Sequence, residues 1–229
     1  MHRLRRHQLV RLTDAGWRTV LQRPWDAQAA DCLSYWAAHR LPLVVTRQPG
    51  EAACDDAIAL GLPAPARWDR RRLSLRVPRT AVLYVDAFPR LAEVLGLLPR
   101  SAARPVRALA AALQCLRANV RVFGSHGWQQ MTGLRYVRPE SDLDLWIGID
   151  DAARADEIAE PLQAFDAAKP RLDGEFMFPD GAAVAWREWA AWRAGRTRSL
   201  LVKRLDGVAL HHDLGWCGLR TSAVAEMPA

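Results

Sequence analysis

The chain has 229 residues, which is enough for one large domain or two small ones with a buried core. Half of the residues are hydrophobic and a quarter are charged, a globular balance that excludes a mostly disordered chain. The net charge is +7, and no apolar run approaches the roughly 18 to 20 residues that a bilayer span needs. We therefore expect no membrane association. We also expect a cytoplasmic location, because no signal-peptide pattern follows the basic start.

The excess of positive charge has two possible origins. The chain contains two lysines, Lys169 and Lys203, so nearly all of its 32 basic residues are arginines. An arginine-rich, lysine-poor composition is typical of a GC-rich coding sequence, which we favour as the source of most of the charge. The alternative is a polyanionic partner, either a nucleic acid or a small polyphosphate.

The cysteines show neither a CxxC spacing nor close pairing, so we expect buried free thiols and neither a zinc site nor a disulfide framework. They are Cys32, Cys54, Cys115 and Cys217.

In the first half of the chain, the pattern predicts one helix and three short strands. Apolar residues at helical spacing predict a helix over Asp26–Arg40, with Asp26 as its N-cap. Strand-like runs follow at Leu43–Thr46, Leu73–Val77 and Ala81–Val85. The sequence Gly61–Pro65 between the first two runs is predicted to be a turn. The sequence Leu98–Pro105 is predicted to connect two domains, residues 1–98 and 99–229.

In the second half, helices and strands alternate, which predicts an α+β (mixed α/β) domain built on one mixed sheet with flanking helices. The first half is then a smaller α+β domain. The predicted strands are Val120–Phe123, Leu143–Ile149, Leu172–Phe178 and a pair within Leu200–Leu210 around Asp206-Gly207. The predicted helices are Val106–Leu116, one opening at Trp128–Met131, Ala152–Ala168, and a helix or wide turn at Ala183–Trp192.

Two acids enter one of these strands in the sequence Ser141-Asp142-Leu143-Asp144-Leu145. Because strand side chains alternate, Asp142 and Asp144 lie on one face, about 7 Å apart along the strand. Two carboxylates at this distance repel each other unless a cation lies between them, and hard oxygen ligands of this kind suit Mg²⁺. The alternative is a strand that begins in solvent with two exposed acids.

The neighbouring sequence supports a site at this pair. Upstream, a strand runs into Gly124-Ser125, a turn whose backbone N–H groups and hydroxyl can hold a phosphate. Downstream, Asp173 and Glu175 alternate on another strand, and either can supply a third carboxylate. Two Mg²⁺ ions, roughly 3.5–4 Å apart, could then clamp both oxygens of an in-line phosphoryl displacement.

This combination resembles the nucleotidyltransferase superfamily that includes DNA polymerase beta, which has a Gly-Ser turn, an acid–hydrophobic–acid strand and a third acid on a later strand. A longer string is similar to one family, the phosphoribosyl-dephospho-CoA transferase (holo-acyl-carrier-protein synthase) of malonate decarboxylase. The matching segments are Phe123–Leu134, Ser141–Leu145, Leu172–Glu175, Phe178–Gly181 and Val184–Glu188, with weaker ones at Leu41–Val45, Gly61–Pro65 and Arg71–Leu75.

The resemblance implies a nucleotidyltransferase-like catalytic domain after a smaller domain that contacts the donor or the carrier. The donor would be 2′-(5″-triphosphoribosyl)-3′-dephospho-CoA. The acceptor would be a serine of the apo acyl carrier subunit of malonate decarboxylase, and pyrophosphate would leave. No long nucleic acid and no membrane would be involved.

The resemblance also implies roles for individual residues. Asp142, Asp144 and Glu175 would hold Mg²⁺. Glu175 would be the third acid, with Asp173 as the competing choice, and could help to remove the serine proton. Gly124 and Ser125 would bind the leaving pyrophosphate, aided by basic side chains. We rank Arg187 and Lys203 first for that role, ahead of Arg121, Arg135 and Arg138.

Other candidates are weaker. His126 follows the Gly-Ser turn and either contacts a phosphate or caps the helix. His211-His212-Asp213 resembles a metal site, but adjacent histidines on a strand face opposite ways, so we favour a structural role. Trp186, Trp189 and Trp192 form a helical stripe that we assign to the core rather than to adenine stacking. Arg70–Arg72 is either a solvated basic turn or a contact for an acidic carrier.

Two rival functions remain open at this point. The first keeps the superfamily and changes the acceptor to the citrate lyase carrier, RNA or a small molecule. The second is a basic binding module without catalysis, whose binding would be salt-sensitive. The pair Asp142/Asp144 argues against the second, because a polyanion binder gains nothing from clustered carboxylates.

Overall fold

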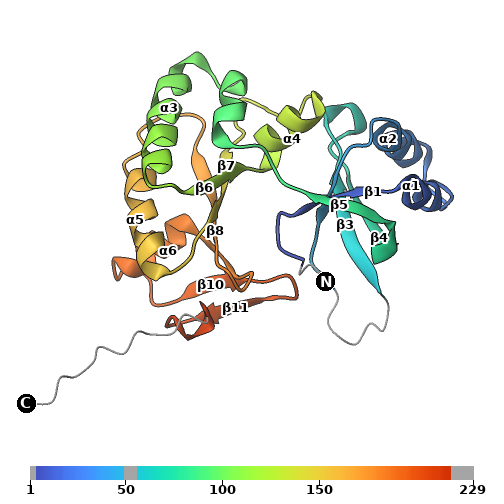
Figure 1. The fold of residues 1–229 in the computed structure, drawn as a ribbon. Coiled ribbons are helices and arrows are strands. Elements are labelled where there is room, and N and C mark those ends of the chain that lie inside the picture. Colours follow the sequence, from blue (N-terminus) through green and yellow to red (C-terminus); the bar gives the residue numbers. More distant parts are fainter. Residues whose placement is uncertain (1–3, 49–55, 218–229) are drawn as a thin grey trace, which may run out of the picture.

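The computed structural model describes residues 4–48 and 56–217. Two β-sheets lie side by side, each with helices of its own, and α4 lies where the two halves meet (Figure 1). The structure therefore has the expected α+β class, with strands and helices in both halves. Among the described residues, no helix is long and apolar enough to cross a membrane.

The first half contains an antiparallel five-stranded sheet in the order β4-β3-β2-β1-β5. Its strands are β1 (Leu9–Leu12), β2 (Leu43–Val45), β3 (Ala57–Pro63), β4 (Arg72–Pro78) and β5 (Val82–Asp86). Its helices are α1 (Asp14–Leu21) and α2 (Ala27–Ala38), and short 3₁₀ turns cover Ala66–Trp68 and Arg79–Ala81. A 3₁₀ helix at Leu91–Leu97 leads into the second half and packs in its core.

The second half contains a six-stranded mixed sheet in the order β11-β10-β9-β8-β7-β6, in which β7 and β8 run parallel. Its strands are β6 (Asn119–Val122), β7 (Leu143–Gly148), β8 (Leu172–Met177), β9 (Ala183–Ala185), β10 (Leu200–Lys203) and β11 (Val208–His211). Its helices are α3 (Arg100–Cys115), α4 (Gly124–Thr132), α5 (Ala152–Gln163) and α6 (Trp186–Arg193), and a 3₁₀ turn covers Gly215–Cys217.

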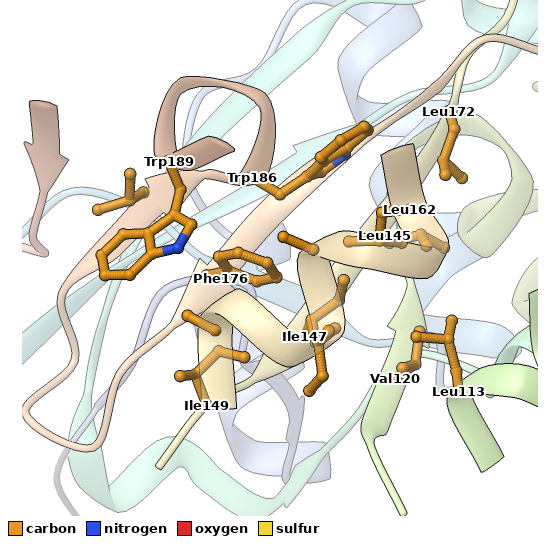
Figure 2. Close-up of a cluster of buried hydrophobic side chains, with 14 of the residues drawn as sticks. Leu113, Val120, Leu145, Ile147, Ile149, Leu162, Leu172, Phe176, Trp186 and Trp189 are labelled. Carbon is orange, nitrogen blue, oxygen red and sulfur yellow. The ribbon is translucent and has the colours of Figure 1, made fainter. Parts of the chain in front are cut away.

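The alternation of β7 separates a packed face of this sheet from a functional one. Leu143, Leu145 and Ile147 are fully buried and pack with residues of α3, α5 and α6 (Figure 2). Asp144 and Trp146 lie between them in sequence, so they point to the opposite face, where the start of α4 approaches Asp144. Burial of the apolar side therefore fixes the direction of the acidic side.

The expected tryptophan stripe is confirmed as core. Trp186 and Trp189 are 2% and 0% exposed and lie in the cluster of Figure 2, and Trp192 packs against it. Cys32 and Cys217 are buried and Cys115 is exposed, all three as free thiols, whereas Cys54 lies outside the described residues.

A second core belongs to the first sheet but includes residues of the second half. Trp128 of α4 is 4% exposed and meets Phe88 edge to face at 5.5 Å. Tyr136 stacks on Trp128, and its hydroxyl donates to the Pro63 carbonyl oxygen at 2.7 Å. Helix α4 thus joins the two halves through its own side chains.

Several predicted elements are confirmed. Helix α2 begins after Asp26, whose Oδ1 accepts from the Ala29 N–H as an N-cap should. Strands β10 and β11 pair as the expected hairpin around Asp206-Gly207. The predicted helix or turn at Ala183–Trp192 is the short strand β9 followed by α6.

Two predictions were wrong. The expected connector Leu98–Pro105 is largely the first turns of α3, because Ala102, Val106 and Leu109 form a buried helical stripe that outweighs the missing N–H of Pro105. The expected turn Gly61–Pro65 begins inside β3, which pairs with strands on both sides.

Strand β1 and helix α1 were not predicted, since the sequence there suggests only a basic start. Helix α4 begins at Gly124 rather than at Trp128, so Gly124-Ser125 forms its first turn. Helix α5 ends at Gln163, five residues before the predicted end.

Candidate active site

Parallel pairing of β7 with β8 gathers the acids on the functional face of the second sheet. The register places Asp144 opposite Asp173 and Trp146 opposite Glu175. Asp142 lies just before β7 on the same side as Asp144. Three aspartates therefore surround one point of the sheet, and Glu175 lies two register pairs further along on the same face.

An arginine binds two of these aspartates. Arg171 donates through Nε and Nη2 to Asp142 at 3.2 and 2.5 Å, and Nη2 also reaches Asp173 Oδ2 at 3.1 Å. The sequence interpretation missed Arg171, although it stands two residues before Asp173 and therefore shares its strand face. Its guanidinium shows that the cluster draws in positive charge.

The pKa of Asp144 shows that the carboxylates lie close together. Burial, together with the neighbouring charges of Asp173 and Asp142, raises the pKa of Asp144 to about 7. A nearby cation would reverse this effect by favouring the carboxylate. Arg171 supplies only part of the positive charge that would compensate these carboxylates, so the site can accept a further cation.

The backbone at Gly124 meets the Asp144 carboxylate directly. A Cβ at Gly124 would lie 1.9 Å from Asp144 Oδ2, and the residue has a φ of +61°. Helix α4 starts here, and no side chain caps its N-terminus. The N–H groups of its first turn, near Ser125, therefore have no capping side chain as a hydrogen-bond acceptor. A helix N-terminus beside the acid cluster is an arrangement that can bind phosphate between the two.

His126 is held in a structural position. It is 1% exposed, and its Nδ1 lies 3.0 Å from the Asp142 carbonyl oxygen, which can only accept, so Nδ1 carries the proton. Burial lowers its pKa and favours the neutral ring. His126 therefore orients the backbone of the acid strand, as a partner of the site rather than a capping residue.

Glu175 lies in a separate network at the junction of the two halves. Its carboxylate accepts from Lys203 Nζ at 2.8 Å, from His7 Nε2 at 2.8 Å and from Arg6 Nη2 at 3.4 Å. Burial alone would raise the pKa of Glu175, but the hydrogen bond and charge of His7, with Arg6 and Lys203, hold it below its usual range. Nothing in the sequence pattern pairs residues 6 and 7 with residue 175.

The basic residues ranked for phosphate binding make other contacts. Arg187 donates through Nε and Nη2 to the Leu172 carbonyl oxygen at 3.2 and 2.7 Å, and Lys203 binds Glu175. Arg121 donates to the Phe88 carbonyl oxygen at 3.0 Å, and Arg138 pairs with Glu140 at 2.9 Å. The Arg135 main chain accepts from Ala66 N–H at 3.2 Å.

The remaining candidates have structural partners. His212 Nδ1 lies 3.0 Å from the Arg198 carbonyl oxygen, and Asp213 accepts from the Gly215 N–H. Arg70 donates to the Tyr136 carbonyl oxygen, and Arg71 forms a two-pronged pair with Asp26. These contacts stabilise the local fold.

The donor set fits Mg²⁺ in an open form. Among residues 4–48 and 56–217, no three His, Cys, Asp or Glu side chains make a ready-built metal cage. Mg²⁺ seldom uses one: it binds through one or two carboxylates, waters and substrate phosphates. Asp142, Asp144 and Asp173 supply such oxygens. Arg171 is 61% exposed, so its ion pairs cost little to break.

Comparison with protein families covers nearly the whole described chain. Residues 5–88 match the phosphoribosyl-dephospho-CoA transferase MdcG N-terminal domain, and residues 90–213 match the C-terminal domain of the same family. The chain belongs to this family. The second match contains the complete acid cluster, and the first contains Arg6 and His7.

Named relatives agree with this placement. A phosphoribosyl-dephospho-CoA transferase of Bradyrhizobium diazoefficiens is 36% identical over 207 residues, covering 90% of this chain and 88% of that protein. One of Xanthomonas axonopodis pv. citri is 34% identical, covering 86% and 89%. One of Pseudomonas aeruginosa is 33% identical, covering 74% and 78%. No solved structure matches the chain.

The contact at Gly124 predicts that a methyl group at this position destabilises the protein more than one at a comparable glycine. Gly124→Ala must adopt a left-handed backbone and displace the Asp144 carboxylate. Gly133→Ala is the matched control, because Gly133 ends the same helix at φ +69° with no atom within 4 Å of its Cβ position. In urea unfolding, we expect the free energy of unfolding to fall by about 1 kcal/mol in the control and by roughly 2–4 kcal/mol in Gly124→Ala. Equal losses would contradict the contact.

The Glu175 network predicts a pH-dependent contribution to stability. Its folded pKa lies below the ordinary 4.5, so its stabilisation is present above that pH and is lost as the pH falls below it. Glu175→Gln should lower the free energy of unfolding by about 3 kcal/mol at pH 7, with the deficit shrinking below pH 4.5.

Glu157→Gln is the control for this measurement, because Glu157 pairs with Arg154 at the surface. It should cost about 1 kcal/mol or less. A deficit for Glu175→Gln that stays constant from pH 7 to pH 3 would contradict the network.

Proposed function

We propose that this chain transfers the phosphoribosyl-dephospho-CoA group from 2′-(5″-triphosphoribosyl)-3′-dephospho-CoA to a serine of an acyl carrier protein, and that Mg²⁺ is required. The carrier is the apo acyl carrier subunit of malonate decarboxylase, and the reaction takes place in the cytoplasm. The observation that carries the proposal is the cluster Asp142, Asp144 and Asp173 facing the N-terminus of α4, in a chain that belongs to the transferase family.

The chemical step is an in-line displacement at phosphorus. The serine oxygen bonds to the α-phosphorus of the donor, the bond between that phosphorus and the bridging oxygen to the β-phosphorus breaks, and pyrophosphate leaves. The carrier keeps a phosphodiester, and the serine proton passes to a base. The first turn of α4 at Gly124 and Ser125 binds the departing phosphates through main-chain N–H groups.

When bound, Mg²⁺ neutralises phosphate charge and polarises the reacting phosphoryl oxygens. Asp142 and Asp144 hold it, and we assign the third carboxylate to Asp173 because its strand position is directly opposite Asp144. Glu175 is less suited, since His7, Arg6 and Lys203 already occupy its oxygens and its low pKa makes it a weak base. Asp173 accepts the serine proton.

Loss of either central carboxylate should remove transfer without unfolding the protein. With donor, Mg²⁺ and apo-carrier, the wild-type protein should add the mass of the whole group to one carrier serine, read by intact mass spectrometry. Asp142→Asn and Asp144→Asn should each slow transfer by about 100-fold or more, and chelation with EDTA should stop it until Mg²⁺ returns. Asp166→Asn, at an exposed position, is the control and should react normally.

Unchanged rates in both variants, or full activity in EDTA, would contradict the metal role. Modification by ordinary nucleoside triphosphates, with no reaction from the triphosphoribosyl donor, would instead indicate another nucleotidyltransferase substrate.

The third carboxylate can be identified from the metal requirement. Asp173→Asn should raise the Mg²⁺ concentration for half-maximal transfer, whereas Glu175→Gln should leave that concentration unchanged. The reverse pattern would assign the third ligand to Glu175.

A further inference from the structure

A basic cavity of about 300 Å³ lies beside the acid cluster, on the same face of the second sheet. The N-terminal segment before β1 forms one wall, the end of β5 another, and β6 and β7 form the floor. Trp146 on the floor is two residues beyond Asp144 on β7, about 7 Å along the strand. A ligand extending from the acid cluster along this face therefore enters the cavity.

Basic side chains make up most of the ionisable lining of the cavity. Arg5, Arg6, His7 and Arg121 line it, and the carboxylate that also lines it, Asp86, is neutralised by Arg11 at 2.8 Å. Within the described residues, the buried Nε of Arg6 has no hydrogen-bond partner. Arg121 uses one nitrogen on a carbonyl oxygen, which leaves its other donors for a ligand. Guanidinium groups gathered in this way suit a diphosphate.

The floor supplies a flat aromatic surface. The ring of Trp146 lies over Gly148, where a Cβ would come within 3.3 Å of Cη2, so the missing side chain makes room for the indole. Trp146 is half-buried and lines the cavity. An indole beside guanidinium groups is a platform on which a nucleobase can stack.

The cavity wall depends on Glu175. Trp146 and Glu175 are register partners, and the Glu175 carboxylate binds both Arg6 and His7 of the wall. The ring of His7 also packs at a tilt against the ring of Phe123, directly before α4, with 4.1 Å between the ring centroids. Glu175 is thus a positioning residue: it holds the cationic wall next to the sheet face on which the acids lie.

We propose that this cavity binds the adenosine 5′-diphosphate part of the donor's dephospho-CoA, with the adenine on Trp146 and the diphosphate on Arg5, Arg6 and Arg121. The identity of the donor rests on the function proposed above. A volume of about 300 Å³ is at the lower end for ligand pockets, which suits one nucleotide unit rather than the whole donor. The triphosphate then extends from the cavity to the acid cluster and the α4 N-terminus.

The test is calorimetric binding of dephospho-CoA in EDTA, which removes any contribution from metal-bound triphosphate. The wild-type protein should bind it, Trp146→Ala should weaken binding by about 5- to 100-fold, and Arg121→Gln by roughly tenfold. Arg104→Gln is the matched charge control, because Arg104 is exposed on α3 at the opposite face of the sheet. This control should bind like the wild type.

Competition identifies the part of the ligand that is recognised. ADP should displace dephospho-CoA, and 4′-phosphopantetheine should not. Displacement by 4′-phosphopantetheine alone, or wild-type affinity in both Trp146→Ala and Arg121→Gln, would overturn the cavity assignment. If transfer to the carrier still occurs in that case, the proposed function stands without this site. A protein that binds dephospho-CoA as expected but never modifies the carrier would support the cavity and refute the function.

Discussion

The carboxylate of Glu175 is the contact on which the arrangement of the two halves most depends. It is 7% exposed and binds Lys203 from its own sheet together with Arg6 and His7 from the start of the chain. A buried carboxylate is costly unless cations and hydrogen bonds compensate it, and here the compensation comes from both halves. The N-terminal segment is therefore held beside the second sheet.

A second electrostatic constraint acts two register pairs away. Asp142, Asp144 and Asp173 crowd each other, and Arg171 relieves only part of the repulsion from an exposed position. The two groups of charge are opposite in character. Glu175 is an anion surrounded by basic side chains, whereas the three aspartates are anions with too few cations around them. A bound cation, which we propose to be Mg²⁺, would satisfy the second without disturbing the first.

Local patterns in the sequence predicted most strands of the second half and the shared face of Asp142 and Asp144. Alternation predicted β7 and β8, and the pair Asp142/Asp144 could be read as lying on one face. Local patterns could not predict contacts between residues far apart in the sequence, such as that between His7 and Glu175, which spans 168 positions. The same limit explains why the choice between Asp173 and Glu175 stayed open, because it depends on the register between two strands.

Other failures have local causes. The sequence Leu98–Pro105 was predicted to be a connector, but the buried spacing of Ala102, Val106 and Leu109 makes most of it helical. Arg171 could have been found by the same alternation that placed Asp173. Trp146 lies in the predicted strand Leu143–Ile149, yet its importance follows from the cavity that it lines, which no spacing rule describes.

Helix α4 has a consequence for how this protein can be divided. The family matches separate at residues 88 and 90, yet Trp128 of α4 belongs to the core of the first sheet while Gly124 at its start touches Asp144. A fragment that starts at that boundary would expose the indole of Trp128, whose core partners belong to the first sheet. We therefore expect the two family segments to fold and work as one unit.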